Sequence, residues 1–293
     1  MAVNPWGKMR HTWKGWDGSE WDLSRPSGGV FLLREGLEGL GMPDFTNHTT
    51  TSPVVHGSQW QDWIATGRKV YWNVGIYSDA GSADWIRLNR AFWKTMRPGK
   101  TGVWTVHLPT GEKFSLTLRL SPGTGASFNQ DPVQHGWKSY GIELFPEQPF
   151  WEGEQIVREW GSEELIPFLG DGDAGPPFHV SRAATLREAT LTNPGDVESF
   201  IQWTVKGPTD SVMLGVGGEN TVVPFHIPDG EKLIVVTDPR ELTAELNGED
   251  VMERLREFNY PVLPPGEDVK LSLAMEGAGS IEARFTPYYL MGL

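Results

Sequence analysis

The segment Met96–Thr101 contains the sequence in this chain that most resembles a nucleotide-binding motif. Gly99, Lys100 and Thr101 match the end of a P-loop, in which a glycine-rich turn surrounds a phosphate and the lysine pairs with it. A P-loop also needs a glycine five residues before Gly99, where this chain has Lys94. The segment also follows a predicted helix, whereas a P-loop follows a strand. We therefore interpret it as a helix end.

The histidines and acidic residues also lack the spacing of a metal or catalytic site. The seven histidines form no His-x-His or His-Glu-x-x-His pair. Asp171 and Asp173 alternate around a glycine, but the glycine and glutamate that would complete a calcium-binding EF-hand are missing. Glycoside hydrolysis requires two carboxylates, and the chain has 38 acidic residues. The sequence does not single out any two of them as a catalytic pair. We expect no cofactor, no metal and no enzymatic activity.

Composition narrows the class of protein. The 293 residues are enough for two domains, and the absence of cysteine excludes disulfides and cysteine-ligated zinc. Residues 1–153 hold 15 Lys and Arg against 14 Asp and Glu, whereas residues 154–293 hold 10 against 24. So acidic a chain is a poor ligand for nucleic acid. No apolar run is long enough for a signal peptide or a membrane span, so we expect a soluble protein made in the cytoplasm.

Tryptophan is concentrated in the first half, because 12 of the 14 tryptophans lie at or before Trp151. Each can bury roughly 150–250 Å² of surface. Twelve such side chains together exceed what one small core normally holds. Tryptophan is also enriched at the centres of protein interfaces. We therefore expect part of this set to lie at a surface that another subunit covers.

The first half is predicted to be mostly β, a sandwich or split barrel with one helix over about residues 82–97. The helix is expected to begin at Ser82, with Asp84 in its first turn, and to end before Pro98. Its predicted core face recurs at helical spacing and consists of Trp85, Leu88, Phe92 and Met96. The polar stretch 47–55 is expected to be a loop.

The strand expected at Arg68–Tyr77 carries large side chains on both of its faces, and we expect it to pair with Gln59–Ala65. Such a strand is either buried between layers or used for contact with a neighbour. The candidate oligomer interface therefore combines this strand with the tryptophans of its expected partner: Trp60, Trp63, Val70, Tyr71, Trp72, Val74, Ile76 and Tyr77.

Residues 154–184 are expected to form a linker or arm, because they include the run GDGDAGPPF. From about residue 185 to 293, short alternating strands recur at intervals typical of an antiparallel β-sandwich. Trp203 alternates with Ile201 and Val205, so its side chain is expected in the core. The domains predicted are thus 1–153 and 185–293, joined by 154–184.

Six sequence segments of the first half, spread over about 145 residues, are similar to those of a known family. They are RHTWKGWDGSEWDL (10–23), GVFLLREGLEGLGMP (29–43), TTSPVVHGSQW (50–60), VYWNVGIYSD (70–79), AFWKTMRPGKTGVWTVHLP (91–109) and WKSYGIELFPEQPFWEGE (137–154). This half resembles the N-terminal domain of siphophage distal tail proteins, often termed minor tail proteins in phages of actinobacteria. The second half is similar in layout to the galectin-like C-terminal sandwich of that family, through TNPGDVESFIQWTVKGP (192–208) and YPVLPPGEDVKLSL (260–273).

The resemblance implies a structural protein of the virion, at the tip of the phage tail. Proteins of this family form a closed ring, expected to have six copies, between the tail tube and the tip hub or baseplate. The implied partners are other copies of the chain, the tube protein and the hub protein, with the tape measure and receptor-binding proteins as further candidates. Six copies of the acidic half would carry about −84 and repel one another, so we expect residues 1–153 to close the ring and 185–293 to lie outside it.

A carbohydrate-binding module that aids host attachment is the alternative function. Exposed tryptophans and a galectin-like sandwich would both suit the stacking of sugars. Trp203 is the only tryptophan of the predicted sandwich, and its expected place in the core argues against a stacking platform there.

Overall fold

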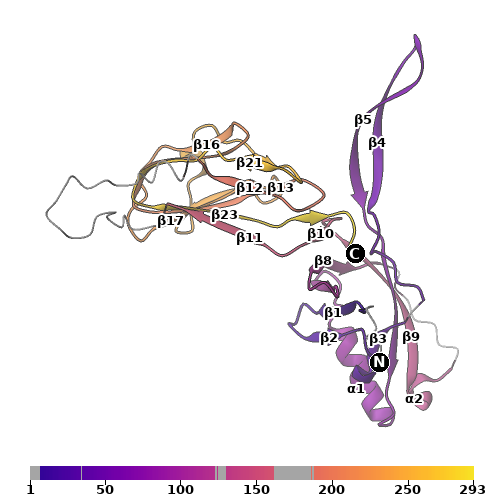
Figure 1. Cartoon of the computed structure of the whole chain (residues 1–293). Helices are drawn as coiled ribbons and strands as arrows, with labels where there is room; N and C mark the ends of the chain where they lie inside the picture. The colour runs from indigo at the N-terminus through magenta and orange to yellow at the C-terminus, as the bar shows by residue number, and fades with distance from the viewer. Residues whose placement is uncertain (1–6, 34, 123, 125–129, 162–185, 187) are drawn as a thin grey trace, which may run out of the picture. The chain divides into compact units, whose positions relative to one another are not determined.

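The computed structural model describes residues 7–33, 35–122, 124, 130–161, 186 and 188–293 (Figure 1). It is mainly β, as the sequence predicts. The chain divides into two compact units, which we call unit 1 (Met1–Gly153 and Tyr289–Leu293) and unit 2 (Glu154–Tyr288). No helix of the described residues is long and apolar enough to cross a membrane.

Unit 1 is built on one antiparallel sheet in the order β2-β1-β7-β8-β9-β6-β3, in which β10 also pairs with β8, and β24 pairs with β10. Its strands are β1 (Arg10–Lys14), β2 (Glu20–Asp22), β3 (Val30–Leu32), β6 (Val70–Tyr77), β7 (Thr101–His107), β8 (Lys113–Leu120), β9 (Trp137–Pro146), β10 (Trp151–Glu152) and β24 (Tyr288–Tyr289). A separate two-stranded sheet pairs β4 (Asp44–Ser52) with β5 (Val55–Gly67).

Strand β6 lies inside the sheet, between β3 and β9, and this position decides which of its side chains are buried. Val70, Trp72, Val74 and Ile76 are each 0% exposed. The alternation expected for this strand is therefore present, and its inward face belongs to the core. The expected pairing of Gln59–Ala65 with this strand is wrong, because β5 pairs with β4.

One side of this sheet is covered by α1 (Ser82–Lys94), and short helices η1 (Pro26–Gly28) and α2 (Pro132–His135) lie in the connections. The helix begins one residue after Gly81, which takes the N-cap position in place of Ser82. Trp85, Phe92 and Met96 are buried, and Leu88 is half-buried against the same core. The Trp85 indole N–H donates to the carbonyl of Ile76 at 3.2 Å, which ties the helix to β6.

Four tryptophans form a continuous chain of edge contacts in this core. Trp72 lies 5.3 Å from Trp13 and 5.4 Å from Trp104, and Trp104 lies 4.9 Å from Trp151, between ring centroids. Edge contacts of this kind stabilise aromatic pairs by about 0.5–1.5 kcal/mol beyond the burial of their area. The core of unit 1 therefore buries Trp85 as well as these four tryptophans. Trp16, Trp60 and Trp137 are exposed.

Unit 2 packs a six-stranded antiparallel sheet and several short ladders around a second core. The large sheet runs in the order β11 (Ile156–Trp160), β23 (Ser280–Phe285), β14 (Gln202–Lys206), β17 (Lys232–Val236), β18 (Thr243–Leu246) and β19 (Glu249–Asp250). The other elements are β12 (Thr190–Thr192), β13 (Ser199–Phe200), β15 (Thr209–Val216), β16 (Glu219–Val223), η2 (Met252–Arg254), β20 (Val262–Leu263), β21 (Asp268–Lys270) and β22 (Ala274–Gly277). Trp203 lies in this core at 0% exposed, as its alternation predicts.

Three segments differ from their expected structure or lie outside the described residues. Residues 156–160 of the expected linker form β11 and pair with β23, whereas 162–185 lie outside the described residues. The last residues, Tyr289–Leu293, return to unit 1, where the Gly292 N–H donates to the Leu40 carbonyl at 3.0 Å. The stretch 47–55, expected to be a loop, is mostly strand β4 because β5 pairs with it along its length.

Candidate functional site

The most unusual surface of unit 1 is the β4–β5 hairpin, which projects from the rest of the unit (Figure 1). All nine residues of β4 are exposed, and the ladder runs from Asp44 opposite Gly67 to Ser52 opposite Val55. Neither strand pairs with a third strand among the described residues. A two-stranded hairpin is marginally stable by itself, and unpaired edges readily add a further chain. The hairpin is therefore a candidate contact with another protein.

One face of the hairpin carries its aromatic side chains. The register places Phe45, Asn47 and Thr49 on this face, opposite Ala65, Trp63 and Trp60. Trp60 is 57% exposed, and its indole N–H donates to the Asn47 side-chain oxygen at 3.1 Å. Trp63 is half-buried between Phe45 and Phe150, at 6.1 and 6.4 Å between ring centroids. We call Phe45, Trp60 and Trp63 the hairpin aromatic face.

Few charges lie on the hairpin. From Asp44 to Gly67 the chain contains two aspartates and two histidines, with no lysine or arginine. Of the other 20 residues, ten are Thr, Ser, Asn or Gln, eight are apolar and two are glycine. Threonine suits extended backbone because its β-branched side chain fits a pleated surface. Natural edge strands usually carry lysine or other charges that prevent unwanted pairing. The scarcity of charge here favours a hairpin that is covered in use.

Arg68 anchors the base of the hairpin, where β5 meets β6. Its side chain is only 4% exposed. The guanidinium donates to the carbonyls of Pro149 at 2.5 Å, Gly39 at 2.7 Å and Leu290 at 2.7 Å, and also to that of Gly41. Burial lowers the pKa of Arg68 to about 10, so the group remains charged at neutral pH. One side chain therefore joins the hairpin base to three other segments, including the C-terminal residues.

A second aromatic surface lies on the side of the sheet that faces away from the core. Strand β6 turns Tyr71 and Tyr77 to this side, where Phe31 of β3 and Trp137 of β9 pack at 5.9 Å across Gly75. A Cβ added to Gly75 would lie 2.6 Å from the Trp137 ring, so the close approach of that ring depends on glycine. We call this surface the aromatic sheet face, and it comprises Phe31, Tyr71, Tyr77, Trp137 and Phe145.

The residues predicted for the oligomer interface fall into two sets. Trp60 and Trp63 lie on the hairpin, and Tyr71 and Tyr77 lie on the aromatic sheet face, where Tyr77 is 44% exposed. The other four are closed to a neighbour because the inward positions of a central strand fill the core: Val70, Trp72, Val74 and Ile76. Sequence reasoning missed Phe45, Phe31, Trp137 and Phe145, although Trp137 and Phe145 alternate with Tyr140, Ile142 and Leu144 in the sequence.

Among the residues that the structure describes, the chemical motifs of the sequence do not come together in a reactive site. Gly99 and Lys100 lie in the turn between α1 and β7, where the Lys100 N–H donates to the Arg97 carbonyl at 3.1 Å, and Thr101 begins β7. Asp171 and Asp173 lie outside the described residues. The part of the chain that the structure describes contains no group of three His, Asp or Glu side chains able to hold a metal ion.

His11 is a buried ionisable group in the core of unit 1. It is 8% exposed and stacks on Trp104 at 5.8 Å between ring centroids. Burial lowers its pKa below the usual value of 6.5, and the nearby His107 adds to this effect, whereas Asp22 opposes it. The Nδ1 atom has no hydrogen-bond partner among the described residues. The folded protein therefore favours the neutral imidazole.

The lowered pKa predicts that unit 1 loses stability in mild acid. Above pH 6.5 the ring is neutral in both states, whereas below it the unfolded chain binds a proton that the folded chain resists. The free energy of unfolding should fall by at most about 1.4 kcal/mol per pH unit from this group. Thermal unfolding of the chain and of His11→Phe between pH 8 and 5 measures the difference. Equal slopes for both proteins would contradict the assignment.

Comparison with solved structures gives likenesses to phage tail proteins. The Dit protein of phage SPP1, described as a paradigm of the hub adsorption apparatus in phages that infect Gram-positive bacteria, superposes with a TM-score of 0.64 at 12% identity. The match covers 97% of this chain and 100% of that chain. The chain has the fold of a phage Dit protein. With 97% of this chain covered, the match includes residues of both unit 1 and unit 2.

Two further matches come from baseplate structures of phage P2 in its activated conformation. The calcium form gives a TM-score of 0.52 and the strontium form 0.54, both at 11% identity. Each covers 95% of this chain and 98% of the other. No family model matches the sequence, and no curated protein matches it. The Dit fold is therefore recognised through the arrangement of the backbone.

Proposed function

We propose that this protein is a structural distal tail protein of a siphophage, whose copies close into a ring, six in number, between the tail tube and the tail tip. The observation that carries the proposal is the Dit fold over 97% of the chain, including both units. The phrases of the first half that resemble distal tail proteins support it independently, because the structural match rests on only 12% identity. The galectin-like character of unit 2 and the link to actinobacterial phages belong to the same proposal.

The contact that closes the ring joins the hairpin aromatic face of one copy to the aromatic sheet face of the next. These are two different patches of the same chain, and a ring needs such heterologous contacts. The first patch projects with unpaired edges, and the second exposes Tyr77, Trp137 and Phe145 at 44%, 39% and 39%. Each surface thereby covers apolar area that the other leaves exposed to water.

Charge supports unit 1 as the part that closes the ring. Residues 1–153 carry a net charge of +1, whereas residues 154–293 carry −14. Like charges brought close together in several copies oppose association, and near-neutral surfaces do not. The partners in this proposal are the neighbouring copies, the tube protein and the tip hub protein, and the place is the virion tail tip.

Electron microscopy of the purified full chain in negative stain tests the proposed function. We expect particles with a central hole and six-fold symmetry, and a mass near six chains by light scattering. Residues 1–153 alone are unsuitable as a substitute, because Leu290 and Gly292 take part in the packing of unit 1. Particles that stay monomeric as the concentration rises would overturn the ring.

A further inference from the structure

Helix α1 of unit 1 presents a basic surface to the solvent. Residues 85–111 contain no aspartate or glutamate, and their five lysines and arginines are all exposed. We call these five residues the basic helix face: Arg87, Arg90, Lys94, Arg97 and Lys100. The first three follow one another at spacings of three and four residues, which places them on one side of the helix. A partner that covers this side would meet mainly positive charge.

Part of this charge has a role inside unit 1. Lys94 lies in the last turn of α1, where a cation interacts favourably with the helix dipole. Arg87 pairs with Asp84 at 2.5 Å, and Asp17 lies close enough to Lys94 for their charges to interact. Arg90 precedes the last turn, so neither role explains it. The basic helix face therefore carries more charge than the fold of unit 1 uses.

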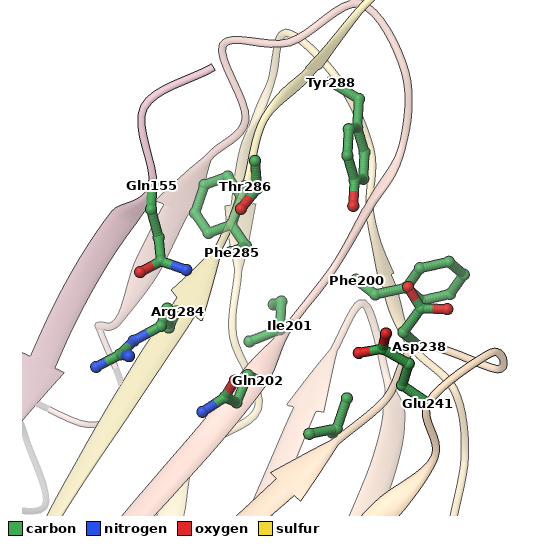
Figure 2. Close-up of a pocket in the computed structure, with 11 residues that line it drawn as sticks. Gln155, Phe200, Ile201, Gln202, Asp238, Glu241, Arg284, Phe285, Thr286 and Tyr288 are labelled. Carbon is green, nitrogen blue, oxygen red and sulfur yellow. The ribbon is translucent and has the colours of Figure 1, made fainter. Parts of the chain in front are cut away.

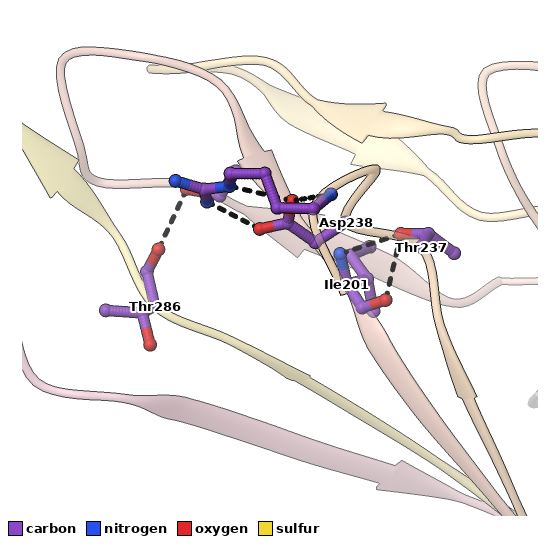
Figure 3. Close-up of polar contacts among 6 residues, drawn as sticks. Ile201, Thr237, Asp238 and Thr286 are labelled. Carbon is purple, nitrogen blue, oxygen red and sulfur yellow. Dashed lines mark hydrogen bonds and ion pairs between the residues drawn. The ribbon is translucent and has the colours of Figure 1, made fainter. Parts of the chain in front are cut away.

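Unit 2 contains a run of the opposite charge in residues 241–253, which include five acidic residues and no lysine or arginine. The loop that leads into this run is held by hydrogen bonds (Figure 3). The Thr237 hydroxyl accepts from the Ile201 N–H at 3.2 Å and donates to the Ile201 carbonyl at 2.9 Å. The Asp238 carboxylate accepts from the Arg240 guanidinium at 2.9 and 2.5 Å, so its charge is already paired.

The acidic side chains after this pair lie at the end and the edge of the large sheet. Glu241 comes first, beside Asp238 (Figure 2). Glu245 of β18 lies directly opposite Asp250 of β19, which is the last strand of the sheet, and Glu249 is the preceding residue of β19. All three side chains are exposed. We call Glu245, Glu249 and Asp250 the acidic edge.

Protection of a free sheet edge explains only part of the acidic edge. Charges on an edge strand discourage unwanted pairing, and this role fits Glu249 and Asp250. Glu245 lies one strand inward, and like charges directly opposite each other destabilise a sheet. On the same face, toward the middle of the sheet, Glu282 bonds to Arg284 at 2.8 Å. A cationic surface that covers the acidic edge would relieve the repulsion there.

The two surfaces match in spacing as well as in charge. Residues four apart on a helix lie about 6 Å apart along its axis, and opposite residues of a β ladder lie about 4.5–5.5 Å apart. Arg90 and Lys94 can therefore face Glu245 and Asp250 together. We propose that the basic helix face of one copy binds the acidic edge of unit 2 of a neighbouring copy.

The choice of a second copy rests on the proposed assembly, because copies that assemble bring the two surfaces together in equal number. Residues 154–293 carry a net charge of −14, and their mutual repulsion falls when each acidic edge is covered by a basic helix face. Exposed ion pairs are individually weak. The contact therefore orders neighbouring copies and does not assemble them by itself.

Zero-length carbodiimide cross-linking of the full chain tests this contact, because the reagent joins a lysine amine to a carboxylate only where the two touch. Unlabelled and isotope-labelled chains are mixed while dilute and concentrated until they assemble, and the linked peptides are identified by mass spectrometry. We expect mixed-label links from Lys94 or Lys100 to the acidic edge at about 0.1 M salt. At about 1 M salt, where the screening length falls to about 3 Å, they should be at least about fivefold fewer.

Charge reversal gives a second measurement. Arg90→Glu leaves both lysines available for cross-linking, yet it should lower the yield of mixed-label links at least about fivefold. Glu245→Arg added to the same chain should restore the yield, because the two charges are then exchanged. Lys270→Glu, at an exposed lysine of β21, is the matched control for net charge and should leave the yield unchanged.

Each contrary result overturns the contact. Assembled chains without mixed-label links would show that it is wrong while the ring stands, and links only between equal labels would place it within one chain. Labelled duplex DNA that binds the unaltered chain and not Arg90→Glu would make nucleic acid the occupant of the basic helix face. Light scattering records the ring separately, so a monomeric mass would overturn the ring and the contact together.

Discussion

Trp60→Ala should dissociate the proposed ring into monomers under conditions in which the unaltered chain assembles. Trp60 is 57% exposed and its indole N–H donates to Asn47 of the same hairpin, so its removal leaves the rest of unit 1 packed. Tryptophans at the centre of an interface typically contribute about 2–4 kcal/mol each. Each contact between copies should weaken roughly 30- to 900-fold. Size-exclusion chromatography with light scattering measures the change in mass.

Gln59→Ala is the matched control for this variant. Gln59 is the neighbour of Trp60 on β5, is exposed, and pairs with Thr50, which places it on the opposite face of the hairpin. Its replacement should leave the ring intact. A ring that survives Trp60→Ala would show that the hairpin aromatic face makes no essential contact, and loss of the ring in both variants would show that the contact involves the other face.

Engineered cysteines give an independent reading of the same contact, because the chain contains none of its own. Thr49 lies on the hairpin aromatic face, and Ser139 lies on the aromatic sheet face opposite Gly75. In a heterologous contact, Thr49→Cys or Ser139→Cys alone should not link copies, whereas the double variant should form a ladder of linked copies. A ladder from either single variant would indicate a symmetric contact instead.

Arg68→Lys should destabilise unit 1 by about 3 kcal/mol, although it keeps the positive charge. The guanidinium donates to four backbone carbonyls from Gly39, Gly41, Pro149 and Leu290, and an ammonium on a shorter reach cannot serve them all. Carbonyls left buried without a donor raise the free energy of the folded state. The melting temperature of unit 1 should fall by roughly 6–12 °C.

Arg87→Lys is the comparison for this substitution. The Arg87 side chain is 71% exposed and pairs with Asp84 on the surface of α1, so its replacement should change the melting temperature little. Hydrogen exchange provides a second measurement, because loss of the bond to Leu290 should speed exchange at the Gly292 amide. Equal melting shifts in the two variants would contradict the role assigned to Arg68.

Local patterns in the sequence predicted the elements that depend on neighbours in the chain. The spacing of Trp85, Phe92 and Met96 places large side chains on one side of a helix, because residues three and four apart share a face. The alternation in 70–77 likewise separates two faces of a strand. The change in tryptophan content and in charge near residue 153 agrees with the end of the first segment of unit 1.

What only the tertiary structure decided is which elements meet. Alternation shows that a strand has two faces, but it does not name the partner, so β5 was expected beside β6 and lies beside β4 instead. The same limit applies to Val70 and Trp72, since a large apolar face suits a core and an interface equally until the neighbouring strands are known. The Arg68 bond to the Leu290 carbonyl, for example, joins residues far apart in the chain. Such contacts arise from the packing of whole sheets, so the spacing of residues along the chain does not predict them.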